Sequence, residues 1–196
     1  MNRQKLDTVT SFKYHGSIVS DEGSKPEILT RIAQTTTALT RLKPVWNDRN
    51  ISLNSKIGLI RSLVTSIFLY ACESWTLTAE LYRRIQALEM RCYRKILRIS
   101  YKDHVTNEEV CAKIQQAIGS QADLLTIVKR HKVQWYGHIS YSSGLAKTIL
   151  QGTVRGGRRQ SGQKKRREGN IGEWTGLELL GPRGQWKAEK NGGNWS

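Results

Sequence analysis

The sequence has no closely spaced pair of cysteines, few acidic side chains and no long apolar run. Its three cysteines, Cys72, Cys92 and Cys111, are widely spaced and form no CxxC pair, which argues against a zinc ribbon or a disulfide framework. The longest uncharged apolar stretch, residues 62–72, is too short to span a bilayer, and the first residues lack the apolar centre of a secretion signal. We therefore expect a nuclear or cytoplasmic protein that is neither secreted nor transmembrane.

Patterns typical of enzymes are also missing. The aspartates are scattered and none is adjacent to another: Asp7, Asp21, Asp48, Asp103 and Asp123. A polymerase site that uses two metal ions needs at least two carboxylates held at one point. Neither a P-loop nor the motifs GxSxG and HExxH occur. We therefore expect no catalytic residues, no cofactor and no small-molecule substrate.

Positive charge is what the sequence has in excess. It contains 32 Lys and Arg against 16 Asp and Glu, a net charge of +16, and its pI is about 10.1. Such a surplus attracts polyanions and speeds their capture. The leading partners are therefore RNA, DNA or an RNA–DNA hybrid, ahead of an anionic membrane surface.

The spacing of apolar and capping residues predicts a mainly α fold in three parts. Residues 1–23 contain a short β-hairpin over 8–20, and residues 24–150 form a bundle of about five helices. We expect these helices over 24–44, which opens with a Ser24–Glu27 capping box and ends at Pro44, and over 52–71, 78–97, 106–118 and 123–139. Residues 151–196 are rich in Gly and basic residues and predict a disordered basic tail.

The predicted helix over residues 78–97 carries the clearest candidate binding surface. At 3.6 residues per turn, basic side chains form one narrow stripe: Arg84, Arg91, Lys95 and Arg98. Arg83 and Arg94 lie beside this stripe, and only Glu80 and Glu89 dilute it. Guanidinium groups in such a row suit a phosphate backbone. A solvated charged face is the equally weighted alternative.

A second basic segment lies in the predicted tail, at residues 155–167 (RGGRRQSGQKKRR). Flexible Gly/Arg segments follow single strands by charge, and here the candidates are Arg158, Arg159, Lys164, Lys165 and Arg166. The same segment is typical of a nuclear localisation patch, or of a tail that only confers solubility.

Residues 129–138 (KRHKVQWYGH) mix cations with rings that could stack on bases. We favour instead a helix end with Trp135 buried in the core. His131 and His138 are seven positions apart, whereas zinc-binding helices pair histidines at i,i+4, and no cysteine lies nearby in the sequence. The sequence therefore predicts no metal site.

Several blocks resemble the C-terminal part of the endonuclease–reverse transcriptases of RTE-type non-LTR retrotransposons. They are residues 12–17 (FKYHGS), 69–76 (LYACESWT), 91–98 (RCYRKILR), 135–138 (WYGH), 156–160 (GGRRQ) and 164–166 (KKR). Their order and spacing extend the resemblance over roughly residues 8–175. His15 stands where the family usually has Leu, Arg167 stands where it has an aromatic residue, and the pattern is lost after about residue 176, as in a decayed copy.

The resemblance implies a primer-grip hairpin with Phe12, Lys13, Tyr14 and Gly16, then a helical thumb that holds a template–primer duplex by its backbone, then a basic region. The fingers, the catalytic palm and the endonuclease of the family would precede these parts, so the resemblance implies a fragment that cannot polymerise. Three alternatives stay open: a non-functional product of a decayed element, a nuclease that uses Asp103, Glu108 and Glu109, and a protein–protein module that uses the apolar face of residues 52–71.

Overall fold

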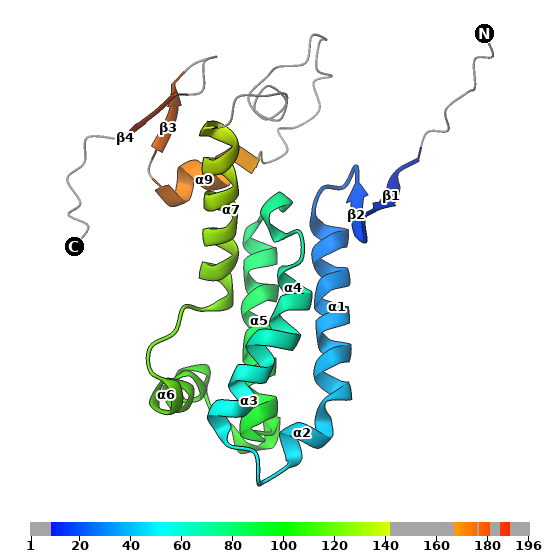
Figure 1. Ribbon diagram of the computed structural model, residues 1–196, viewed down its shortest axis with the longest axis vertical. Coiled ribbons are helices and arrows are strands. Elements are labelled where there is room, and N and C mark those ends of the chain that lie inside the picture. The colour runs from blue at the N-terminus through cyan, green and yellow to red at the C-terminus, as the bar shows by residue number, and fades with distance from the viewer. Residues whose placement is uncertain (1–8, 142–166, 176, 181–184, 189–196) are drawn as a thin grey trace.

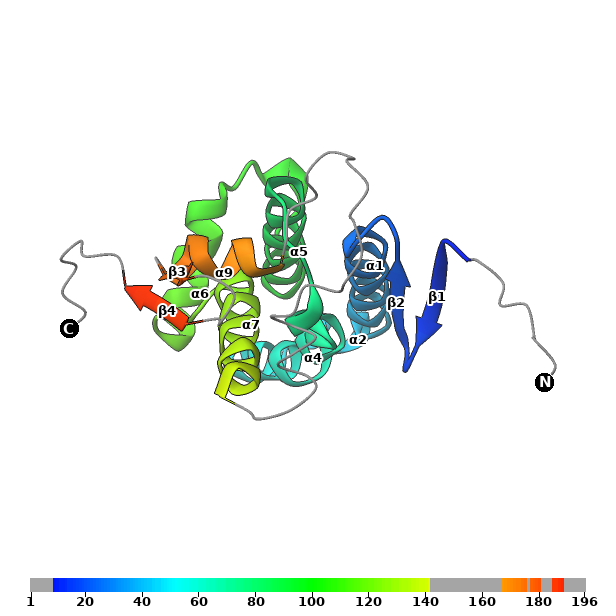
Figure 2. The same ribbon diagram turned by 90° about the horizontal axis from the view of Figure 1, so that it is seen from above.

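The computed structural model describes residues 9–141, 167–175, 177–180 and 185–188, and these are mainly helical with an N-terminal antiparallel hairpin (Figure 1). Three long helices run lengthwise: α1 (Lys25–Arg41), α5 (Ala79–Leu97) and α7 (Leu124–Tyr141). The view along this axis shows α5 and the α4 segment on opposite sides of the bundle, between α1 and α7 (Figure 2). The predicted fold class is confirmed.

The hairpin consists of β1 (Ser11–Tyr14) and β2 (Ser17–Ser20), and Tyr14 pairs with Ser17 across a two-residue turn. Both turn residues have positive φ, 46° at His15 and 82° at Gly16. This is the backbone of a type I′ turn, whose twist matches that of the strands. Glycine at the second position avoids the strain that His15 accepts at the first.

The hairpin is held to α1 by two buried charges. The Glu27 carboxylate accepts a hydrogen bond from the Ile18 amide at 2.6 Å, and Arg31 donates to the Gly16 carbonyl at 2.7 Å. Arg31 and Glu27 also form an ion pair at 2.6 Å. The predicted capping box at Ser24 is therefore wrong: Glu27 serves the hairpin, and Ser24 Oγ accepts instead from the Thr76 amide at 2.8 Å.

The end of the first helix also differs from the prediction. Helix α1 ends at Arg41, and Pro44 lies in the first turn of the short helix α2 (Lys43–Asn47), a position that tolerates proline because no amide is needed there. The Trp46 side chain is fully buried and its Nε1 donates to the Leu39 carbonyl at 2.7 Å. This contact folds α2 back on α1.

The helix predicted over residues 52–71 is interrupted by a π-helical turn. It consists of α3 (Leu53–Leu59), the π-turn η1 (Ile60–Val64) and α4 (Thr65–Leu69). The wider turn changes the phase of the apolar face, so Phe68 is fully buried whereas Leu63 is 49% exposed. Tyr70 then leaves the helix in an extended conformation, and Ala71 adopts a left-handed one (φ 57°) that starts the 3₁₀ turn η2 (Cys72–Ser74).

Local capping signals set the next two helices as predicted. Thr78 caps α5 by accepting from the Leu81 amide, and the predicted apolar stripe of α5 is buried throughout: Leu81, Ile85, Leu88, Cys92 and Ile96. After the short turn η3 (Tyr101–Asp103), helix α6 (Asn107–Ile118) opens with both bonds of the Thr106–Glu109 capping box and ends at Gly119, where φ is 75°.

Helix α7 buries a different aromatic ring from the one predicted. Tyr136 is 3% exposed, whereas Trp135 is only half-buried, so the placement of Trp135 in the core was wrong.

No helix within the described ranges combines the length and apolarity needed to cross a bilayer.

Part of the predicted tail folds onto the bundle, as helix α9 (Arg167–Thr175). The Asn170 side chain is buried and exchanges two hydrogen bonds of 3.0 Å with the backbone of Leu77, and Trp174 donates to the Tyr82 hydroxyl at 3.1 Å. A second hairpin follows, β3 (Leu177–Leu180) with β4 (Gln185–Ala188). The rest of the predicted tail (residues 151–166, 176, 181–184 and 189–196) lies outside the described residues.

Candidate nucleic-acid interface

The outer side of α5 forms one wall of an open groove of about 780 Å³. Asn47 at the end of α2, Asn107 at the start of α6 and residues 98–100 after α5 also line it. Five cations line it: Arg83, Arg91, Arg94, Lys95 and Arg98. Among the described residues that line it, none is acidic. The groove therefore joins positive charge with neutral amide side chains.

The two glutamates of α5 stay out of this groove. Glu89 is buried on the opposite side, where its carboxylate accepts from the Leu124 amide and from the Tyr93 hydroxyl, each at 2.9 Å. Glu80 pairs with Lys25 at 3.1 Å and with Arg84 at 2.9 Å, and these two cations lower its pKa. Glu80 and Glu89 therefore do not lower the positive charge of the groove lining, contrary to the expectation from the sequence.

Arg84 is the one predicted member of the stripe that the groove does not include. Its guanidinium makes two hydrogen bonds to Glu80, at 3.0 and 2.9 Å. A cation that is already paired on the surface presents less net charge to a ligand, so Arg84 contributes less than its position in the sequence suggests. Arg83, which the sequence places beside the stripe, takes its place in the lining.

Two of the lining arginines, Arg94 and Arg98, also have structural contacts. Arg94 donates to Asn107 at 2.7 Å and to the Val105 carbonyl at 2.9 Å. Arg98 donates to the carbonyls of Trp46 and Asn47 at the end of α2, which satisfies acceptors that a helix C-terminus leaves free. These bonds hold the guanidinium groups in place on the wall of the groove.

Arg83 and Lys95 are the lining cations whose side chains have the fewest contacts. Both side chains are exposed, and neither forms a hydrogen bond or an ion pair within the described part of the chain. Arg91 is exposed as well and makes one contact, to the Thr36 hydroxyl at 3.2 Å. These three cations can turn toward a ligand without breaking a buried interaction.

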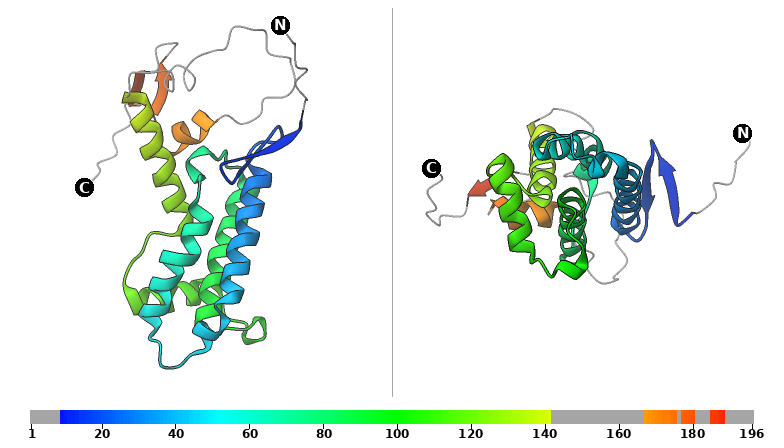
Figure 3. Two further views of the ribbon diagram at one scale, coloured as in Figure 1. Left: turned by 45° about the vertical axis from the view of Figure 1, so that its right-hand side comes forward. Right: turned by 90° about the horizontal axis from the view of Figure 1, so that it is seen from below.

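The residues predicted as a primer grip do not line the groove. Phe12, Lys13, Tyr14 and Gly16 are all exposed on the hairpin, and none of them belongs to the groove lining. The hairpin is at the end of the bundle opposite α2, whose last residue Asn47 lines the groove (Figures 1 and 3). The structure therefore does not join the hairpin and the basic groove into one site. The tail cations Arg158, Arg159, Lys164, Lys165 and Arg166 lie outside the described residues.

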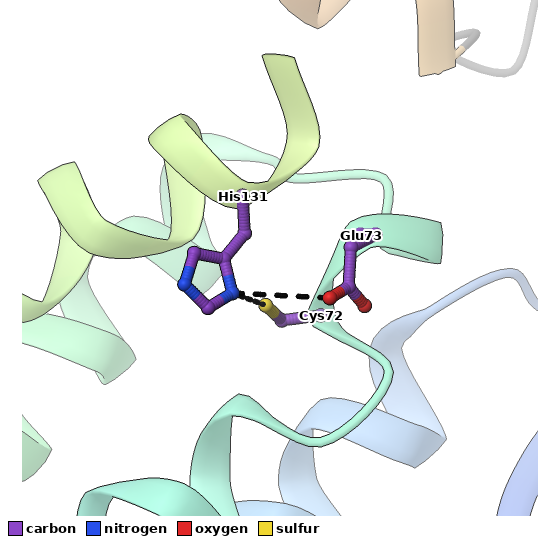
Figure 4. A group of neighbouring side chains, drawn as sticks. All are labelled: Cys72, Glu73 and His131. Carbon is purple, nitrogen blue, oxygen red and sulfur yellow. Dashed lines mark hydrogen bonds and ion pairs between the residues drawn. The ribbon is translucent and has the colours of Figure 1, made fainter. Parts of the chain in front are cut away.

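The structure also brings together a group of candidate metal ligands that the sequence did not indicate. Cys72 Sγ lies 3.7 Å from His131 Nδ1, and a Glu73 carboxylate oxygen lies 3.8 Å from the same nitrogen (Figure 4). No cysteine lies near His131 in the sequence, but folding brings Cys72 beside it from 59 positions away. Burial, and then the Glu73 charge, raise the pKa of the Cys72 thiol to about 12, so this thiol is protonated at neutral pH.

A comparison with protein-family models, with curated proteins and with solved structures finds no match to this chain.

Proposed function

We propose that the chain binds the phosphate backbone of RNA, DNA or an RNA–DNA hybrid along the α5 groove, with little preference for base sequence. The observation that supports this most strongly is the gathering of five cations and no acid in one open groove. Four of the five are arginines, whose planar fork matches two phosphate oxygens at once. The asparagine amides at the two ends can donate further hydrogen bonds to the backbone.

We further propose that the chain derives from an RTE-type non-LTR retrotransposon and corresponds to the thumb region of its reverse transcriptase. The support is the sequence resemblance over residues 8–175, together with the order of a hairpin followed by helices. The resemblance assigns the catalytic aspartates of the family to a different region. We therefore expect binding without polymerisation, and we expect the basic segment over residues 155–167 to add affinity or to direct nuclear import.

A protein–protein role for the apolar face of residues 52–71 has less support. Ile57, Ile60, Val64 and Phe68 on this face are 0–3% exposed and belong to the core of the same chain. A partner would have to displace the neighbouring helices to reach them. A non-functional product remains the alternative if the purified chain fails to unfold cooperatively.

Binding of a labelled RNA–DNA hybrid across a salt series tests the proposed function. The affinity of the unchanged chain should fall linearly with salt on logarithmic axes, because bound phosphates release counterions. The double variant Arg83→Gln/Lys95→Gln should reduce that slope by about 1.5 to 2, which corresponds to two lost phosphate contacts. Both side chains are exposed, so the fold should be unaffected.

The matched control is Lys113→Gln/Arg130→Gln, which removes the same charge from exposed positions on α6 and α7 outside the groove. Its slope should stay close to that of the unchanged chain. Equal slopes for the two double variants would show that net charge, and not the groove, determines binding. Absence of binding even at low salt would overturn the proposed function altogether.

A further inference from the structure

Three different metal-ligating groups meet where η2 packs against α7, separate from the basic groove (Figure 4). The candidate ligand atoms are Cys72 Sγ, a Glu73 carboxylate oxygen and His131 Nδ1, and they all lie within 4.8 Å of one another. Thiolate, imidazole and carboxylate together form a mixed donor set that Zn²⁺ accepts. Such a combination of residue types is not required by packing.

The distances are close to those of a tetrahedral zinc site. Bonds of roughly 2.3 Å to sulfur and 2.0–2.2 Å to nitrogen and oxygen place tetrahedral ligand atoms about 3.3–3.6 Å apart. The two separations from His131 Nδ1 are 3.7 Å to sulfur and 3.8 Å to oxygen. Closing these two takes shifts of a few tenths of an ångström. The third separation, between Cys72 Sγ and the Glu73 oxygen, is no more than 4.8 Å, and rotation of the Glu73 side chain can shorten it. The side chains of His131 and Glu73 are 38% and 35% exposed and have room to make these shifts.

The backbone fixes the position of Cys72. After α4, the left-handed conformation of Ala71 starts η2, in which Cys72 is fully buried while the next residue, Glu73, reaches the surface. Trp75 and Phe68 pack edge to face beside this turn, with ring centroids 5.2 Å apart, and both are buried. The cluster thus has one buried thiol and two partly exposed ligands, beside which water can supply a fourth ligand.

We propose that Cys72, Glu73 and His131 bind one divalent transition-metal ion, best matched by Zn²⁺, with a solvent molecule as the fourth ligand. The imidazole binds as the neutral ring, and the thiol loses its proton to solvent as the metal–sulfur bond forms. The metal ion thus replaces the thiol proton on Cys72 Sγ. By joining η2 to α7 it would link two segments that are 59 residues apart in the sequence.

Titration of the full-length, reduced chain with Co²⁺ tests this site, since Co²⁺ replaces Zn²⁺ in tetrahedral sites and is coloured. One equivalent should produce a sulfur-to-cobalt charge-transfer band in the near ultraviolet and intense visible bands of tetrahedral cobalt. Zn²⁺ should then displace the cobalt and abolish both. Thermal unfolding followed in parallel should shift to higher temperature with Zn²⁺, because an ion bound only to the folded state stabilises it.

Variants show whether these residues are the ligands. Cys72→Ser should abolish the charge-transfer band, and Glu73→Gln and His131→Gln should each weaken the metal by at least about 10- to 100-fold. Glu73 and His131 are partly exposed, so these two variants should fold even if the buried serine disturbs the core. Circular dichroism checks each one.

Matched controls use the same residue types elsewhere. Cys111→Ser removes the exposed cysteine, and His138→Gln removes an exposed histidine of the same helix. Both should bind cobalt as the unchanged chain does. The site is overturned if no one-to-one cobalt complex forms at micromolar concentrations, if the band survives in folded Cys72→Ser, or if Glu73→Gln and His131→Gln bind as tightly as the controls.

Discussion

Glu89 is a buried acid whose partners are not cations. Glu89 is 8% exposed, and its carboxylate accepts hydrogen bonds from the Leu124 amide and the Tyr93 hydroxyl. Burial raises the pKa of Glu89, and the two hydrogen bonds offset this only in part. The side chain joins α5 to the start of α7, and it does not line the groove.

The raised pKa predicts how stability depends on pH. The folded chain holds the Glu89 proton more tightly than the unfolded chain does. The stabilisation from this group is therefore fully present below the ordinary glutamate pKa of 4.5, and it is lost as the pH rises through the folded-state value. Glu89→Gln keeps an acceptor and removes the charge, so it should unfold at higher urea concentration than the unchanged chain at neutral pH.

Urea unfolding of both chains over a pH series provides the measurement, because all other titrating groups cancel in the difference. The advantage of the variant should grow as the pH rises above 4.5. A difference that does not depend on pH, or a variant less stable at neutral pH, would show that the carboxylate is better satisfied than its burial indicates.

At the scale of elements, the hairpin depends on the Glu27–Arg31 pair for its attachment to the bundle. The side chains are 3% and 9% exposed and 2.6 Å apart. The Arg31 guanidinium also lies 4.4 Å from the centre of the Tyr70 ring, whose hydroxyl donates to the His15 carbonyl at 2.5 Å. Strands β1 and β2 bury little apolar surface of their own: Phe12, Tyr14 and Val19 are 46–62% exposed.

Removing one member of this pair should therefore cost more than removing both. Arg31→Gln leaves the Glu27 carboxylate buried without its cation and should lower the free energy of unfolding by about 3 kcal/mol. Glu27→Gln/Arg31→Gln removes the uncompensated charge and should be less destabilised than the single variant. Chemical unfolding measures both, and hydrogen exchange at Ile18 reports release of the hairpin. A double variant as unstable as the sum of the two single variants would contradict this account.

At the scale of the whole molecule, the sequence predicted those elements whose signals are local. Thr78 and the Thr106–Glu109 box cap helices through residues three positions away, and Gly119 ends a helix by its own backbone freedom. The apolar stripe of α5 needs only a 3.6-residue period. These features gave the fold class and placed the cations of α5 on one side, which is the greater part of the candidate interface.

The features that the sequence did not predict depend on contacts between distant residues. Ser24 resembles a helix cap but accepts from Thr76, 52 positions away. The Cys72–His131 contact spans 59 positions, and spacing within one helix cannot indicate it. The π-turn over Ile60–Val64 also changes which side chains of that segment face the core. A 3.6-residue period cannot anticipate such a shift.

The central claim, that the α5 groove binds a phosphate backbone, is tested most directly by lysine protection. The chain is treated briefly with an amine-acetylating reagent at low salt, with and without an RNA–DNA hybrid, and the modification of each lysine is read by mass spectrometry. Lys95 lines the groove, and Lys113 is exposed on α6 outside it. The hybrid should slow modification of Lys95 several-fold and leave Lys113 unchanged. Equal protection of both lysines, or none at Lys95 when the hybrid is bound, would contradict the claim.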